Sequence, residues 1–174
     1  PLYIPCAYAV FQYMGVTASL FLPTSSIVSS SAAAALCGSV FYAAYDLVGA
    51  KYLWWTWHTT DAATLIRWCG VPIGSTMWTM VHIWCFSYIL RKCKRNTNSM
   101  IPSIIISTFL TTPFMMLMMS PFQLHQIEFD ISSFSITQFP GMPDEASISL
   151  TLAVLILAVY KAPPPLSSSP SSSS

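Results

Sequence analysis

Four ionisable side chains lie within or beside long apolar stretches, and they are the residues of this sequence that could do chemistry: Asp46, His58, Asp61 and His82. A carboxylate beside an imidazole can fix the tautomer of the ring for acid–base work. In a helix, His58 and Asp61 would share a face, and Asp46 could approach the same surface from the preceding apolar stretch. These four residues are therefore the catalytic candidates, although their pattern specifies no reaction.

A metal site is a weaker hypothesis for part of the same set. His58, Asp61 and His82 could supply imidazole and carboxylate ligands, but His82 lies far along an apolar stretch from the other two. The alternative is a belt of aromatic and polar residues at the lipid headgroups. We expect no bound metal and no other cofactor.

His82 stands about 11 residues into an apolar run, which places it roughly 17 Å along a helix of 1.5 Å rise per residue. An ionisable group at such a depth in a bilayer is costly unless it has a partner. One interpretation is a ligand or proton-relay histidine. The other is a neutral histidine that is hydrogen-bonded between helices, to a serine or a backbone carbonyl.

A cluster of methionines could bind monovalent copper through its thioethers, although methionine more often fills apolar gaps. The cluster consists of Met115, Met116, Met118 and Met119. No C-x-x-C pair, glycine-rich phosphate loop or nucleophile elbow occurs in the sequence, and nucleic-acid binding has no support.

The composition explains why these polar residues are conspicuous. Hydrophobic residues make up 54% of the 174 residues and charged residues only 7%, whereas soluble domains carry about 25% charged residues. So few charges could not cover a surface that faces water. The composition therefore favours lipid as the surrounding solvent and excludes an ordinary soluble domain.

Apolar run lengths predict the elements that must position the polar residues. A bilayer core about 30 Å thick requires roughly 20 apolar residues as helix. The predicted spans are residues 2–22, 27–48, 71–90, 100–119 and, as an open possibility because it has only 14 residues, 147–160. The expected fold is an all-α membrane protein, a bundle of four to five transmembrane helices.

The segments between these runs have their own signatures. Lys51–Gly70 is too polar to span, and its four tryptophans are typical of a membrane–water interface. A short helix over Thr60–Cys69 is possible there. Residues 161–174 are rich in Pro and Ser, so we expect a disordered tail.

Basic residues predict the orientation of the chain. Arg91–Arg95 contains four of the seven Lys and Arg residues, and such clusters favour the cytoplasmic side. The N-terminus and the Trp-rich segment would then lie on the exoplasmic side. Binding of anionic lipid is the alternative interpretation of the basic run. The expected partners are membrane lipids and other membrane helices or subunits.

Two sequence blocks carry a resemblance to a known family: Trp54–Asp61 reads WWTWHTTD and Gly70–Trp78 reads GVPIGSTMW. They resemble an uncharacterised eukaryotic family of multi-pass membrane proteins that is defined by a domain of unknown function. The resemblance covers about residues 37–95 and implies a membrane fold without an activity. A looser likeness to membrane carotenoid hydratases rests on Asp46 and Gly70–Pro72, and it transfers no catalytic role.

Two functional classes are favoured by these observations, because four or five spans without an internal repeat argue against a third class, a transporter or channel. The first is a non-enzymatic, multi-pass membrane protein that acts as a subunit, a scaffold or a lipid-interacting protein. The second is a membrane-embedded enzyme that acts on a lipid or isoprenoid through the four catalytic candidates. The enzyme requires Asp46, His58 and Asp61 to converge, with Lys51 and Arg67 as the nearby cations. Because the chain begins at Pro1 rather than Met, we expect a fragment or a processed product.

Overall fold

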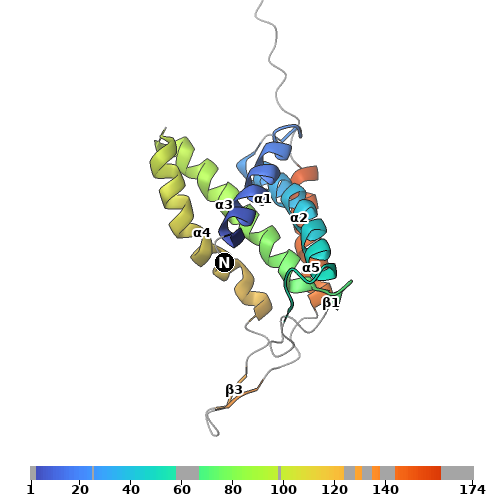
Figure 1. Ribbon diagram of the computed structural model, residues 1–174. Helices are drawn as coiled ribbons and strands as arrows, with labels where there is room; N and C mark the ends of the chain where they lie inside the picture. The colour runs from blue at the N-terminus through green and yellow to red at the C-terminus, as the bar shows by residue number, and fades with distance from the viewer. Residues whose placement is uncertain are drawn as a thin grey trace, which may run out of the picture.

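The computed structural model describes residues 3–24, 26–57, 67–97, 99–123, 128–130, 135–137 and 144–161. Most of these residues belong to five helices (Figure 1), which are α1 (Tyr3–Ser19), α2 (Ile27–Lys51), α3 (Ile73–Thr97), α4 (Met100–Gln123) and α5 (Asp144–Tyr160). Two short antiparallel pairs join β1 (Arg67–Trp68) to β2 (Val71–Pro72) and β3 (Glu128–Asp130) to β4 (Ser135–Thr137). The expected all-α class is therefore confirmed.

The helices form where the apolar runs predict them, but several ends differ. α3 begins after β2, so Val71 and Pro72 are in a strand, and it continues through the basic run to Thr97. Basic side chains in the last turn suit the negative end of the helix dipole, so they extend the helix instead of ending it. The predicted helix over Thr60–Cys69 is wrong at its C-terminal end, where β1 begins at Arg67. Residues 58–66 and 162–174 lie outside the described residues.

The helices run up and down beside one another (Figure 1). α1 packs against α2, α2 packs against α3, and α3 packs against α4, while α5 lies along α2. The α1–α2 and α3–α4 connections lie at one end of the bundle, and the end of α2 lies with β1 at the other. We call this second end the β1 end.

Small residues bring α1 and α2 unusually close. A Cβ atom added to Gly15 would lie 2.5 Å from the Ala34 carbonyl oxygen and 3.0 Å from the Gly38 Cα. At Gly38 an added Cβ would lie 2.6 Å from the Ile83 side chain on α3. Ala32, Ala34 and Ala35 continue this face and are fully buried. Three helices therefore meet where the sequence has no bulky side chain.

On α4, burial is the reverse of the usual pattern in soluble proteins. The buried face of α4 consists of Ser103, Ser107, Thr111 and Met115, at intervals of four residues, and it packs against α3. The hydroxyls of Ser107 and Thr111 donate to the carbonyl four residues earlier, at 2.6 Å each. On the outward face, Phe109 is 76% exposed and Leu117 is 66% exposed. On α4 the hydroxyls of Ser107 and Thr111 are thus satisfied inside while large apolar side chains point out.

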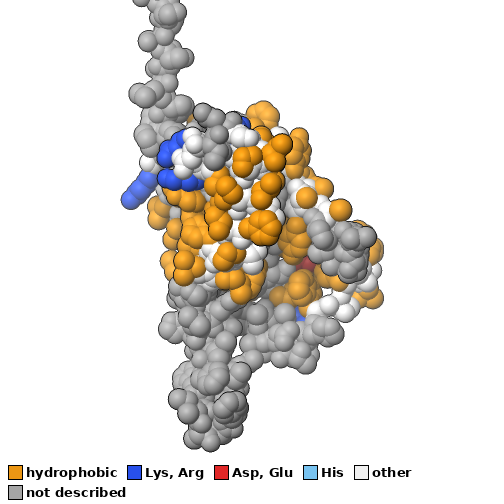
Figure 2. All heavy atoms as spheres, turned by 90° about the vertical axis from the view of Figure 1, so that its left-hand side faces the viewer, with side chains coloured by type: hydrophobic (Ala, Val, Ile, Leu, Met, Phe, Trp, Pro, Cys, Tyr) orange, Lys and Arg blue, Asp and Glu red, His pale blue; other side chains and the backbone are white. Residues whose placement is uncertain are grey.

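Among the described residues, α2 and α4 are long and apolar enough to cross a membrane by length and composition. α1 has 17 residues, the apolar part of α5 is shorter still, and α3 interleaves Ser, Thr and His with its apolar residues. Figure 2 shows apolar side chains spread over one face, with most of the visible Lys and Arg side chains gathered toward one end.

Candidate functional site

The last turn of α2 ends in a tight reversal that folds the following tryptophans back over the helix. Leu53 has a left-handed φ of 57°. Its N–H donates to the Ala50 carbonyl, and the Trp54 N–H donates to the Gly49 carbonyl. These two bonds define a Schellman motif, in which the left-handed position is usually glycine. The consequence is that Trp55 returns to the side of the helix that it has just left.

Gly49 makes room for this return. A Cβ atom added there would lie 2.2 Å from both Cη2 and Cζ2 of Trp55. The indole ring therefore occupies the place of a side chain in the last turn of α2. From that position its Nε1 donates to Asp46 Oδ1 at 2.9 Å.

Asp46 is fully buried, at 0% exposed, and both of its oxygens accept hydrogen bonds. Oδ1 accepts from Trp55, and Oδ2 accepts from Ser75 Oγ at 2.8 Å. Both donors are neutral. Of the two nearby cations, Lys51 is exposed, and Arg67 donates to the Trp57 carbonyl at 2.8 Å.

Ser75 reaches Asp46 because a tight hairpin starts α3 in the right place. Trp68 pairs with Val71, which leaves Cys69 and Gly70 as a two-residue turn with φ values of 52° and 85°. Positive φ at both positions is the signature of a type I′ turn. Pro72 then leads directly into α3, whose first turn carries Ser75.

A chain of hydroxyls connects the carboxylate to Tyr42. Because Ser75 uses its hydrogen to bond Asp46, the 2.9 Å contact between Tyr42 OH and Ser75 Oγ is donated by the tyrosine. Tyr42 stacks on Tyr8 of α1 with ring centroids 5.8 Å apart, and it meets Phe11 edge-on at 5.4 Å. α1, α2 and α3 are therefore tied together at the β1 end.

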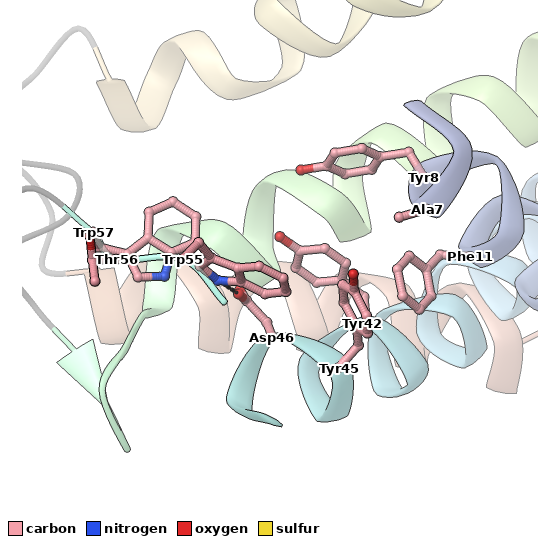
Figure 3. Close-up of a pocket in the computed structure, with 9 residues that line it drawn as sticks. All are labelled: Ala7, Tyr8, Phe11, Tyr42, Tyr45, Asp46, Trp55, Thr56 and Trp57. Carbon is pink, nitrogen blue, oxygen red and sulfur yellow. Dashed lines mark hydrogen bonds between the residues drawn. The ribbon is translucent and has the colours of Figure 1, made fainter. Parts of the chain in front are cut away.

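An open cavity of about 210 Å³ lies against this network. Figure 3 shows its wall, in which Tyr8 on α1 faces Tyr42 on α2 and Trp55 lies over Asp46. We call it the aromatic cavity, and its lining residues are Ala7, Tyr8, Phe11, Tyr42, Tyr45, Asp46, Trp55, Thr56 and Trp57. This volume lies below the roughly 300–1,000 Å³ of typical small-molecule sites, so the cavity suits a single small chemical group.

His82 belongs to a different place. Gln12 Nε2 donates to its Nδ1 at 2.9 Å, which requires a neutral ring with an unprotonated Nδ1. His82 lines a second cavity with Trp78, Thr79, Met115 and Tyr8. The interpretation of a neutral histidine bonded between helices therefore agrees with the structure, with Gln12 as the partner instead of a serine or a carbonyl.

The other candidates are placed as follows. His58 and Asp61 lie outside the described residues, so their convergence with Asp46 is still a prediction. Among the described residues, no three His, Cys, Asp or Glu side chains gather as metal ligands. Met115 is buried, whereas Met116 and Met118 are exposed, and the side chain of Met119 lies outside the described part of the structure.

Sequence reasoning missed most of the residues that form the aromatic cavity. Tyr42, Tyr45 and Asp46 are spaced three and four residues apart, so they share one face of α2. That spacing could have predicted an aromatic wall beside the Asp46 carboxylate. The position of Trp55 over α2 could not be predicted from the sequence, because it depends on the left-handed backbone conformation of Leu53.

Comparison with known proteins adds one finding. Residues 1–170 match the model of a family described as a domain of unknown function (DUF7802). The match includes the chain after Arg95, where the sequence motifs had shown no resemblance. No curated protein and no solved structure matches the chain.

Proposed function

We propose that this chain, which belongs to the DUF7802 family of domains of unknown function, is a multi-pass membrane protein that binds lipid at the aromatic cavity without catalysing a reaction. The observation that carries the proposal is the reversed burial pattern. Ser103, Ser107 and Thr111 are buried while Phe109 and Leu117 project outward. In water this arrangement would expose apolar area without compensation, whereas lipid accepts it.

In this proposal all five helices cross the bilayer. The connections α1–α2 and α3–α4 lie at the same end of the bundle, which is the end that receives the basic run of α3. Under the positive-inside rule this end is cytoplasmic. The aromatic cavity, at the β1 end, then lies at the exoplasmic headgroup region with the N-terminus.

The experiment has two parts. Membranes that contain the chain are washed with alkaline carbonate, and retention in the pellet with release by detergent is the expected result. Single-cysteine variants that retain only Cys69 or only Cys93 are then labelled from outside with an impermeant maleimide. We expect labelling of Cys69, which is exposed in the β1–β2 turn, and protection of Cys93. Carbonate extraction, or labelling of both cysteines, would refute the proposal.

A second candidate function, a membrane-embedded enzyme acting on a lipid or isoprenoid, is favoured by the hydroxyl chain from Tyr42 through Ser75 to Asp46. A buried carboxylate at the end of such a chain has the components of a general acid or base. Tyr42→Phe breaks this chain while keeping the ring. If a turnover of lipid or isoprenoid is found, the enzyme predicts its loss in Tyr42→Phe, whereas a binding site predicts no turnover in either protein.

A further inference from the structure

The walls of the aromatic cavity are chemically unusual, and the inference drawn from them rests on the proposed function. Six of the nine lining residues are Tyr, Trp or Phe, one is Asp46, and none is Lys or Arg. Adjacent rings lie at contact distance, with centroids 5.1 Å apart for Tyr45 and Trp55 and also for Phe11 and Tyr45. The described wall is therefore a cage of π faces with a carboxyl group behind it.

The charge of such a wall selects the ligand. Ring faces carry negative potential and attract cations within about 6 Å of the ring centre. In the part of the chain that the structure describes, the hydrogen bonds to Asp46 come from the neutral donors Trp55 and Ser75. No Lys or Arg is among the described residues that line the cavity, so a carboxylate at Asp46 would add negative potential to it. A cationic group is consequently the best electrostatic complement to the cavity.

The kind of cation follows from hydrogen bonding. A primary ammonium carries three N–H donors that need acceptors. Asp46, however, has no exposed surface and already accepts from two donors. A quaternary ammonium has no N–H group and needs only ring faces and a nearby negative charge. Aromatic cages are the usual protein sites for this group.

We infer that the aromatic cavity binds the trimethylammonium group of a choline lipid. Tyr8, Tyr42, Tyr45 and Trp55 surround the methyl groups, and Asp46 supplies the charge from behind Trp55. The acyl chains would leave along the outside of the bundle. Leu53 and Trp54, which are exposed beside the turn that ends α2, offer apolar surface there.

The test uses the full chain, purified in a maltoside detergent that carries no choline group. The probes are dihexanoyl lipids with three headgroups, phosphatidylcholine, phosphatidylethanolamine and phosphatidylglycerol, together with choline chloride. Tryptophan fluorescence reports binding because Trp55 and Trp57 line the cavity. We expect phosphatidylcholine to bind at least about tenfold more tightly than the other two lipids and more tightly than choline.

Variants separate the cage from general detergent effects. Tyr8→Leu removes one ring of the wall, and Asp46→Asn removes the charge while keeping the shape. Each should weaken phosphatidylcholine binding by about fivefold to thirtyfold. Tyr13→Leu is the matched control, because Tyr13 is on the same helix, is 71% exposed and does not line the cavity. It should leave the affinity unchanged. Thermal unfolding of each variant verifies that it is folded. If Asp46→Asn does not fold, Tyr8→Leu alone still tests the inference.

Equal binding of the three lipids would overturn the inference, as would an unchanged affinity in Tyr8→Leu. Choline that binds as tightly as phosphatidylcholine would overturn the lipid as the source of the cation. These failures are separate from a failure of the proposed function. A chain that resists carbonate extraction and binds the three lipids equally would keep the proposed function, a membrane protein that binds lipid, without the preference for choline.

Discussion

Gly49 offers the sharpest test of how the site is built. In Gly49→Ala the new Cβ would lie 2.2 Å from two carbons of the Trp55 ring, far inside the normal carbon–carbon separation of about 3.5–4.0 Å. A rigid indole cannot fold away, so it must move and lose its bond to Asp46. A lost bond to a charged group costs about 1.5–3 kcal/mol, and crowding costs about 1–3 kcal/mol. Replacing helical Gly by Ala returns about 0.5–1 kcal/mol. The expected net loss is therefore about 2–5 kcal/mol.

The assay is unfolding of the purified protein in detergent, followed by circular dichroism, for Gly49→Ala in two backgrounds. In the wild-type background the substitution should destabilise the protein. In the Trp55→Ala background the ring is absent, so the same substitution should stabilise the protein by the helix-propensity gain alone. This reversal of sign is the signature of a direct contact. A stabilising Gly49→Ala in the wild-type background would refute the described position of the Trp55 ring.

Three further predictions concern the backbone and the helix contacts. Leu53→Gly should raise the free energy of unfolding by about 1 kcal/mol, because the left-handed φ of 57° is strained for leucine; chemical denaturation would measure it, and a loss of stability would contradict the Schellman motif. Gly15→Ala should lower stability by about 1–3 kcal/mol, because its Cβ would meet the Ala34 carbonyl; an unchanged melting temperature would show that α1 and α2 are farther apart. Ser107→Ala should change stability by less than about 0.5 kcal/mol, since the hydroxyl bonds only its own helix, whereas Ser107→Leu should cost about 1–3 kcal/mol by separating α4 from α3; equal effects of the two would contradict a close contact at this position.

The helices were predictable because run length and hydrophobicity are local properties of the chain. α2 was expected at residues 27–48 and is found at Ile27–Lys51. The end of α3 was not predicted, because a charged run marks where a helix meets water and not where its hydrogen bonds stop. The family membership was expected from residues 37–95, although the match covers residues 1–170.

The site was predictable only in part. Asp46 stands out as a lone acid at the end of an apolar run, and its need for partners follows from burial. Its actual partners, Trp55 and Ser75, depend on two left-handed turns, at Leu53 and at Cys69–Gly70. Neither Leu nor Cys signals positive φ, so the sequence indicated Lys51 and Arg67 as nearby cations but gave no sign of the neutral donors.

The way α4 satisfies its hydroxyls has a consequence for the assembly of the bundle. Ser107 and Thr111 bond within their own helix, so in the proposed membrane protein these two hydroxyls would enter a bilayer without exposing an unmet donor to lipid. The Gln12–His82 and Asp46–Ser75 pairs are made only between helices. During synthesis α1, α2 and α3 would therefore have to stay together, or beside the insertion machinery, until these pairs form. The order in which the helices enter the lipid would then depend on whether the polar side chains of each helix bond within that helix or to a neighbouring one.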